Sequence, residues 1–288
     1  MKKTKDSEIQ ALAEEVLQSG VLPITFDYQE VKFFQKETSL ARTTLILNSL
    51  DLGTLTHNEY RFVARRTKEG NMLVQRHIDK LVRVLHAISE KAPQVECFTL
   101  PVYARLLKDG ALANMLFNAF TLYPEASPSK LCVEISSDIL FEDTEDAAKR
   151  LAEIRAMGVK VAISEVGDQF CPVFRLAELP FDYVLLDKYC TASLDREDID
   201  RVAGSLVKYL HCLNTVVIAP DLVNDDQVQG AKSIECNGYS IAQPVYEEET
   251  PIEEDEPEAE AEAELPVEEA PDITEEEETA GEEEELEE

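Results

Sequence analysis

The chain has 288 residues, of which 59 are acidic and 27 are Lys or Arg, so its formal net charge is −32. Residues 247–288 hold 24 of the acidic residues and no basic residue, which leaves the preceding 246 residues with a net charge of −8. A negative body lacks the basic surface expected of a protein that binds DNA or RNA. No apolar run reaches the ~18 residues that a membrane-spanning helix needs, and no apolar stretch typical of a secretory signal follows the basic start.

Six cysteines lie far apart in the sequence, and none forms a Cys-x-x-Cys pair. This spacing excludes the usual zinc sites and favours reduced thiols, so we expect a cytoplasmic protein.

The acidic segment, residues 247–288, combines runs of Glu with four prolines and few apolar residues. Like charges repel and little apolar surface is available for burial, so we expect a disordered tail. Two interpretations stay open: a solubilising tail, or an electrostatic attractant for a basic partner or for a basic patch on the body.

Residues 1–21 are expected to form a helical lead-in, and strands and helices alternate after it. Runs rich in apolar residues predict strands at residues 24–28, 44–47, 95–100, 131–135, 159–163, 183–186 and 215–219. Helical spacing of apolar residues predicts helices over residues 74–88, 144–157 and 199–213. Asp143 is the expected N-cap of the second helix, and Gly158 its stop.

From Leu131 onward the strand–helix unit repeats every ~25–30 residues, which is the rhythm of βαβ units. About eight strands predict one (β/α) barrel over residues 22–246, with an open doubly wound sheet as the alternative. In a barrel, chemistry belongs to the C-terminal ends of the strands.

Motifs at those strand ends resemble a known family. Residues 133–137 (Val-Glu-Ile-Ser-Ser), 158–167 (Gly-Val-Lys-Val-Ala-Ile-Ser-Glu-Val-Gly), 176–187 and 237–244 (Asn-Gly-Tyr-Ser-Ile-Ala-Gln-Pro) are similar, in order and spacing, to motifs of the EAL-domain cyclic di-GMP phosphodiesterases. The resemblance covers roughly residues 22–245 and implies a modified TIM barrel.

The resemblance also implies an active site, and several of its positions are changed here. EAL enzymes hold two divalent metals with carboxylates and one amide at the strand ends. By this match the Glu of the Glu-Ala-Leu motif falls on Thr43, the phosphate-holding Arg on Leu47 and the metal-binding Asn on Thr99. Further along, the first Asp of the Asp-Asp pair falls on Ser164, the Lys on Leu185 and a Glu on Pro220.

Four positions match as vestigial ligand-binding residues: Glu134, Glu165, Asp187 and Asn237. Two carboxylates and an amide carry too little charge to offset the dehydration of two divalent ions, so we expect no metal and no cofactor. A single weakly bound ion at Glu134 and Glu165 is the alternative, beside a polar pocket neutralised by hydrogen bonds.

Other polar groups are better explained as surface residues. His77 and His86 are expected on a helix surface, because no metal-ligand spacing links them. The cluster of Arg61, Arg65, Arg66 and Lys68 predicts an exposed helix face, with a docking patch for an acidic partner or the protein's own tail as the alternative.

The loop over residues 167–173 lacks the second Gly of the family's equivalent loop and contains Pro172. A stiff, apolar loop is not expected to respond to ligand. We expect Phe170 and Val173 to pack inward or to form a protein contact.

The active-site residues of the family are changed in this sequence, while the residues that predict the barrel strands and turns remain. We therefore expect an inactive EAL-like bacterial regulator that acts by protein–protein binding. Its protein partner is unidentified, a homodimer is left open, and cyclic di-GMP is expected to bind weakly or not at all. The alternative is a cyclic di-GMP sensor or a weak phosphodiesterase.

A truncation that ends at Tyr246 tests the boundary of the tail. Because the last barrel motif ends at Pro244, we expect the truncated protein to keep its melting temperature within a few degrees of the full chain. Differential scanning calorimetry of both forms measures this. Aggregation or unfolding of the truncated form at room temperature would show that the tail belongs to the body.

Overall fold

The computed structural model describes residues 24–49, 53–168, 171–194 and 197–242. All of these belong to one compact unit, Met1–Pro244. The helical lead-in expected for residues 1–21, the acidic tail and Phe170 lie outside the described residues.

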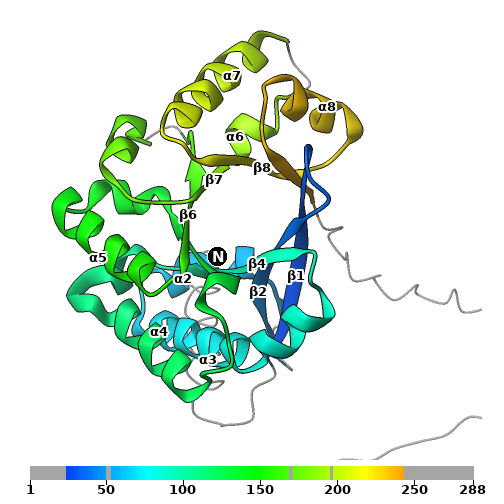
Figure 1. Ribbon diagram of the computed structural model, residues 1–288. Coiled ribbons are helices and arrows are strands. Elements are labelled where there is room, and N and C mark those ends of the chain that lie inside the picture. The colour runs from blue at the N-terminus through cyan, green and yellow to red at the C-terminus, as the bar shows by residue number, and fades with distance from the viewer. Residues whose placement is uncertain (1–23, 50–52, 169–170, 195–196, 243–288) are drawn as a thin grey trace, which may run out of the picture. The chain divides into compact units, whose positions relative to one another are not determined.

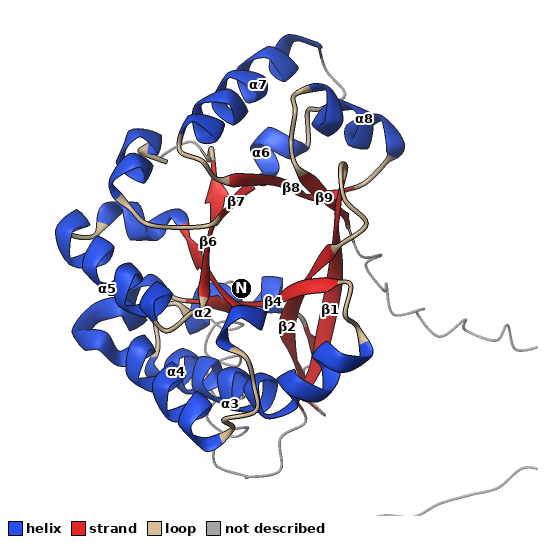
Figure 2. Ribbon diagram, in the orientation of Figure 1, coloured by secondary structure: helices blue, strands red, loops and turns tan. Residues whose placement is uncertain are grey.

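One sheet contains every described strand. The strands are β1 (Ile24–Phe33), β2 (Ser39–Ser49), β3 (Gly53–Leu55), β4 (Val95–Val102), β5 (Leu131–Ser136), β6 (Lys160–Val166), β7 (Tyr183–Leu186), β8 (Val216–Leu222) and β9 (Gly238–Ile241). Eight of them close into a barrel, because β1 pairs with β2 on one side and with β9 on the other. Figure 2 shows this closed ring of strands.

The predicted barrel is confirmed, with one strand reversed. β1 is antiparallel to both neighbours, with Phe26 opposite Leu45 and Lys32 opposite Tyr239. The other barrel pairs are all parallel, and β3 extends β2 as a short hairpin outside the ring. The expected apolar strands therefore lie in the barrel, and the open sheet is excluded.

Helices cover most of the outside of the barrel (Figure 1). The α-helices are α2 (His57–Ala64), α3 (Lys68–Lys91), α4 (Ala111–Leu122), α5 (Thr144–Ala156), α6 (Lys188–Thr191), α7 (Glu197–Cys212) and α8 (Asp225–Ser233). The 3-10 helices are η1 (Ala104–Gly110), η2 (Pro128–Lys130), η3 (Ser137–Phe141) and η4 (Val173–Glu178). In the part of the chain that the structure describes, no helix has the length and apolarity to cross a membrane.

The local signals for α5 act as expected. The Asp143 carboxylate accepts a hydrogen bond from the Asp146 amide at 2.9 Å, which caps the helix. Gly158 follows its last turn with a φ of 89°, a left-handed conformation that favours glycine. The cap and the stop therefore set the limits of α5 and the entry into β6.

Two separate apolar cores result from barrel closure. The inner core consists of strand residues alone: Val31, Phe33, Leu40, Cys97, Cys132, Ala162, Tyr183, Leu185 and Ile218. The outer core joins the other face of the strands to the helices. Because side chains alternate along a strand, membership of one core shows which way each neighbouring strand residue faces.

His77 corrects one expectation, because it is buried rather than on the helix surface. It lies on α3 with 2 % of its surface exposed, and its Nε2 is 2.9 Å from Thr43 Oγ1. The Thr43 hydroxyl donates to the Thr99 carbonyl at 2.6 Å, so Nε2 must be the donor to Thr43. Burial, followed by the charges of His57 and Lys80, lowers the pKa of His77 to about 3.

This lowered pKa predicts a pH-dependent stability. His77 stays neutral in the folded protein but takes up a proton below about pH 6.5 when unfolded. The contribution of His77 to the free energy of unfolding is therefore complete above that pH and decreases as the pH falls toward 3, by up to ~1.4 kcal/mol per pH unit. In a His77→Gln variant this part of the slope should disappear between pH 6.5 and 5, as measured by urea unfolding.

His86 provides the matched control, since its side chain is 52 % exposed on the same helix. His86→Gln should keep the part of the pH slope that the burial of His77 produces. Equal slopes for the parent and His77→Gln would contradict the assignment of a neutral buried His77.

Candidate functional site

The C-terminal ends of the parallel strands carry two carboxylates. Glu134 comes from β5 and Glu165 from β6, and Glu134 is 7 % exposed on the inner face of the barrel. In the pairing of β5 with β6, Glu134 lies beside Ala162 and Ser136 lies beside Ser164. Glu165 follows Ser164 and is therefore nearer to the C-terminal end of the barrel than Glu134. Two carboxylates thus lie at the end of the barrel where barrel enzymes place their chemistry.

A guanidinium group from two strands away neutralises Glu134. Arg42 of β2 donates from Nη2 to Glu134 Oε1 at 2.8 Å and from Nε to Oε2 at 3.1 Å. Thr99 adds a hydroxyl at 3.3 Å from Oε2. Arg42 also donates to Gln29 and lies 3.8 Å from Asp221. This bidentate pair is a strong form of salt bridge, and it occupies both oxygens of Glu134.

The pKa of Arg42 reflects this surrounding. Burial alone would lower it, but the charge of Glu134 and the hydrogen bonds to it, with smaller contributions from Asp221 and Glu165, raise it above its ordinary value. Arg42 therefore remains a cation at any physiological pH, within electrostatic reach of both carboxylates.

Glu165 is held by two further arginines. Arg61 donates to Oε1, and Arg65 Nη2 donates to Oε2 at 2.8 Å. Arg65 also lies 3.5 Å from Asp138 at the start of η3. Glu165 has a φ of 61°, a left-handed conformation that is unfavourable for a residue other than glycine, and the paired guanidinium groups offset that cost.

Helix α2 positions both arginines. It begins with a capping box, in which the Thr56 amide donates to Glu59 Oε2 at 2.8 Å. Arg61 and Arg65 are four residues apart and so share one face, which points at Glu165.

The basic cluster was expected to form an exposed helix face, and this is wrong for two of its four members. The side chains of Arg61 and Arg65 are only 24 % and 22 % exposed, because they hold Glu165. Arg66 and Lys68 are exposed as predicted.

Two residues of β2 that the motif match placed in the active site face the surrounding helices instead. Thr43 contacts His77 of α3, and Leu47 belongs to the outer core, so both face the helices rather than the barrel interior. Leu40 belongs to the inner core, which places Arg42 on the inner face two residues later. The motif match on this strand is therefore displaced by one residue, because a shift of one position reverses every side chain.

The remaining changed positions do line the interior. Thr99 follows Cys97 by two residues on β4, Ser164 follows Ala162 on β6, and Leu185 is itself an inner-core residue on β7. Pro220 is buried two residues after Ile218 on β8. These side chains are small, apolar or uncharged where the resemblance implied charged or amide groups.

Two positions expected as vestigial ligands have structural roles. Asp187 follows β7 and caps α6, with Oδ1 accepting from the Tyr189 amide at 2.9 Å. Asn237 precedes β9 and so lies at the opposite end of the barrel from Glu134. Its Oδ1 accepts from the Val217 amide at 2.6 Å. Only Glu134 and Glu165 of the four expected residues lie near Arg42.

These donors do not fit the two divalent metals that the resemblance implies. Both carboxylates already bind guanidinium groups, and a metal would have to displace them. Within the described ranges, no group of three or more His, Cys, Asp and Glu side chains could hold a metal ion. Carboxylates whose charge is already neutralised by guanidinium groups do not offset the dehydration of two divalent ions.

The loop after Glu165 packs partly as expected. Val173 is half-buried against the outer core, and its carbonyl accepts from the Tyr209 hydroxyl at 3.1 Å. The neighbouring Phe174 is 79 % exposed and meets Tyr209 edge-on. The prediction that this loop does not respond to ligand stays a prediction.

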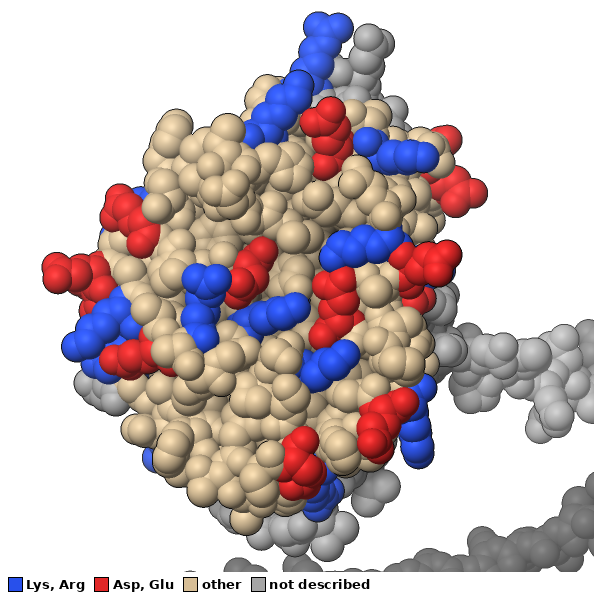
Figure 3. Space-filling view, viewed as in Figure 1, with Lys and Arg blue, Asp and Glu red and all other residues tan. Residues whose placement is uncertain are grey.

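Arg42 is the functional residue that the sequence motifs did not indicate. A signal for it exists, because a carboxylate in an otherwise apolar strand such as residues 131–136 requires a nearby cation. Arg42 is the one cation in the apolar stretch of residues 39–49. Figure 3 shows one mouth of the barrel, where positive and negative side chains are interspersed rather than gathered in a single-sign patch.

Comparison with known proteins places this geometry in a family. The EAL domain family model matches residues 24–244. A curated relative, an uncharacterized signaling protein of Caulobacter vibrioides, is 29 % identical over 122 residues, which cover 41 % of this chain and 15 % of that protein. The chain thus spans less than a fifth of the length of the curated relatives that it matches.

Solved structures agree in fold. The phosphodiesterase PaMucR in complex with c-di-GMP is 17 % identical, with a TM-score of 0.72 over 81 % of this chain and 94 % of that one. The FimX EAL domain of Pseudomonas aeruginosa bound to c-di-GMP is 15 % identical, with a TM-score of 0.68 over 81 % and 93 %. From the family match over most of the barrel and this shared architecture, it follows that the chain belongs to the EAL domain family.

Proposed function

We propose that this chain is a catalytically inactive EAL-domain protein that regulates other proteins by binding them. The observation that carries the proposal is the pairing of Arg42 with Glu134 and of Arg61 and Arg65 with Glu165. A metal-dependent phosphodiesterase needs free carboxylates to hold its ions and to generate a hydroxide. Here the carboxylates serve to hold the barrel mouth and α2 together.

The lysine and glutamate positions of the family support the same proposal. Leu185 and Pro220 are buried on the inner face and cannot stabilise charge that develops on a phosphate. Loss of one ionic group that acts in the transition state reduces turnover by roughly 100-fold or more, and several are absent here. A folded barrel without these groups remains a scaffold for partner proteins.

The alternative is a sensor that binds cyclic di-GMP without cleaving it. Two similar solved structures are named as c-di-GMP complexes, and three arginines lie at this mouth. Against it stands the engagement of those arginines with Glu134 and Glu165, which a dianionic ligand would have to displace. We therefore favour protein binding.

The first prediction concerns turnover and metal. The purified chain with Mg²⁺ or Mn²⁺ should release no linear dinucleotide from cyclic di-GMP, and titration with Mn²⁺ followed by electron paramagnetic resonance should show no tight site. Linear product at an ordinary enzymatic rate would refute the proposal.

The second prediction concerns the Arg42–Glu134 pair. An Arg42→Gln variant leaves a buried carboxylate without its cation, so the free energy of unfolding should fall by about 3–5 kcal/mol. Lys36→Gln is the matched control, because it breaks an ion pair with Glu96 in which Lys36 is 49 % exposed, and it should cost less than about 1 kcal/mol. Urea unfolding of the three proteins measures both, and equal losses would show that the Arg42 pair is not a buried one.

The third prediction separates the two functions. Isothermal titration with cyclic di-GMP should give no binding in the low micromolar range. A ligand at ~100 times its Kd stabilises a fold by about 2.7 kcal/mol, which would raise the melting temperature visibly. Because we expect no such binding, the melting temperature should stay unchanged at ~100 µM nucleotide. Saturable low-micromolar binding would instead establish the sensor.

Protein binding itself is tested by affinity capture in the presence of EDTA and without nucleotide. The proposal requires a partner that co-purifies in stoichiometric amount under these conditions. Capture that depends on added cyclic di-GMP would support the sensor in its place.

A further inference from the structure

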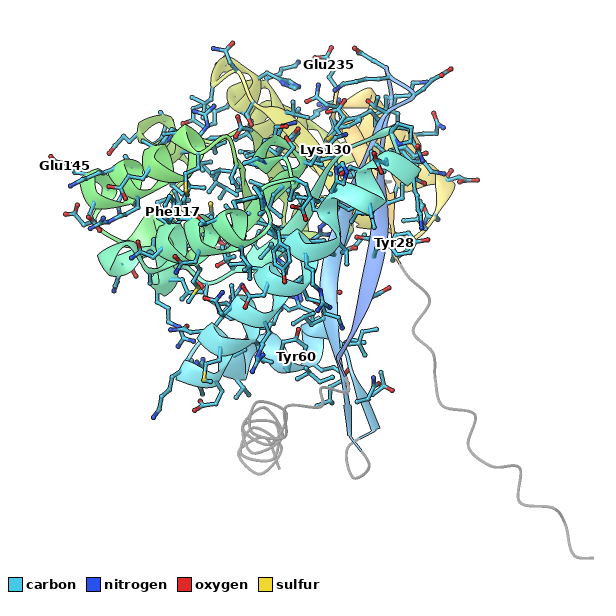
Figure 4. All side chains as sticks on the ribbon, turned by 60° about the horizontal axis from the view of Figure 1, so that its bottom comes forward. Tyr28, Tyr60, Phe117, Lys130, Glu145 and Glu235 are labelled. Carbon is cyan, nitrogen blue, oxygen red and sulfur yellow. The ribbon has the colours of Figure 1, made fainter. Side chains whose placement is uncertain are left out.

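Two of the six cysteines lie together at the barrel mouth that carries Glu165. Cys171 belongs to the loop after β6, and Cys190 lies on α6, directly after β7. Both are half-buried at the edge of the outer core, so neither is sealed in the interior. Figure 4 shows the described side chains with their sulfur atoms in yellow.

Both thiols contact Gly167, the first residue after β6. The Cys190 thiol donates to the Gly167 carbonyl at 3.5 Å. Burial raises the pKa of Cys171, and a hydrogen bond from the Gly167 amide to its sulfur opposes that rise. A Cβ atom at Gly167 would lie 2.6 Å from Cys190 Sγ, so only glycine leaves room for this approach. The two sulfur atoms are thus held against the amide and the carbonyl of one residue.

Backbone hydrogen bonds fix both cysteines to the end of β6. The Cys171 amide donates to the Asp168 carbonyl at 3.3 Å. The Cys190 amide donates to the Asp187 carbonyl at 2.9 Å, and the Asp187 amide donates to the Val166 carbonyl at 2.8 Å. Both segments are therefore anchored within a few residues of each other, and such proximity of the backbone is what a disulfide requires.

Exposure distinguishes this pair from the other cysteines. Cys97 and Cys132 belong to the inner core and are 0 % exposed, so a reagent in solution cannot reach them. Cys236 is buried in the outer core, and Cys212 is exposed. Cys171 and Cys190 combine partial exposure with proximity, which makes them a pair that a dissolved oxidant can join.

We propose that Cys171 and Cys190 form a reversible disulfide that fastens the loop after β6 to α6, with a small disulfide such as glutathione disulfide as the oxidant. One protein thiolate attacks a sulfur of glutathione disulfide, which forms a mixed disulfide and releases one glutathione thiolate. The other protein thiolate then displaces the second glutathione. Two protein thiols are thereby oxidised to one disulfide, glutathione disulfide is reduced to two glutathione thiols, and the two protons pass to those thiols through the solvent.

The surroundings of the two thiols assign Cys171 as the attacking residue. Burial, followed by the charge of Asp187, raises the pKa of Cys190 to about 11. Asp168 and Asp187 also face Cys171, but the Gly167 amide stabilises its thiolate, so Cys171 ionises more readily. Cys190 is then the resolving residue. Because the pKa of each thiol is raised, the exchange is slow at pH 7 and faster at about pH 8.5.

Peptide mapping of the full chain tests the bond. The folded protein is incubated with millimolar glutathione disulfide at about pH 8.5, its free thiols are blocked with N-ethylmaleimide in urea, and the chain is digested with trypsin. Cleavage after Lys160, Arg175, Lys188 and Arg196 leaves Cys171 in the peptide 161–175 and Cys190 in the peptide 189–196. We expect these two peptides to be joined, and to separate after treatment with dithiothreitol. Recovery of both peptides unlinked, or linked to other cysteines, would overturn the proposal.

Single substitutions test the order of attack. A Cys212→Ser background removes the exposed cysteine and should form the bond like the parent chain. In that background Cys190→Ser should accumulate one glutathione adduct on the peptide 161–175, because nothing resolves the mixed disulfide. Cys171→Ser should form its adduct at least about tenfold more slowly. Equal rates in the two variants would contradict the assignment of Cys171, and circular dichroism confirms that both fold.

Thermal melting tests whether the bond fastens the two segments. It closes a loop of about 20 residues and so restricts the unfolded chain, which should raise the melting temperature by roughly 5–10 °C. Dithiothreitol should reverse this rise, and Cys171→Ser should show none in the same reagent. An oxidised parent chain that melts at the temperature of the reduced one would show that the bond strains the fold instead of fastening it, and would overturn this part of the proposal.

Discussion

Closure of the barrel places Glu134 and Glu165 at one mouth, where both are largely withdrawn from water and need a cation close by. Arg42 supplies it from β2, beyond β4, and Arg61 of α2 and Arg65 at its C-cap supply it to Glu165. The two groups of ion pairs therefore join β2 to β5, which only β4 separates in the barrel order, and fasten α2 to the end of β6. In this site, guanidinium groups occupy the carboxylate oxygens on which metal chemistry would depend.

Arginines also fix the loops around this mouth. Arg105 donates to the carbonyls of Ala64 and Thr67, which ties η1 to the link between α2 and α3. Arg175 donates to the carbonyls of Leu140 and Glu142, which ties η4 to η3. Each uses a planar guanidinium group that donates several hydrogen bonds, a geometry that lysine cannot reproduce. The loops at this mouth are therefore tied to one another by side-chain hydrogen bonds.

Sequence patterns predicted the barrel because strand and helix signals agree over most of its length, from the apolar strand of residues 131–135 to the capped helix that begins after Asp143. They did not indicate α4, since a helix without charged residues has little contrast between its faces. Arg42 was missed because the match on β2 was displaced by one residue. Asn237 was assigned to the mouth although it lies at the opposite end. Such errors arise because pairing across the barrel is not encoded in local sequence.

The paired mouth also limits how this chain could change over evolutionary time. Replacing Arg42 alone leaves Glu134 buried and unpaired, and replacing Arg61 or Arg65 alone leaves Glu165 in a left-handed conformation with half of its support. Every single step toward an open carboxylate site thus passes through a less stable protein, and a metal could bind only after changes on β2 and α2 had both occurred. The ion pairs therefore make a metal site at this mouth reachable only through coupled changes on two separate elements of the fold.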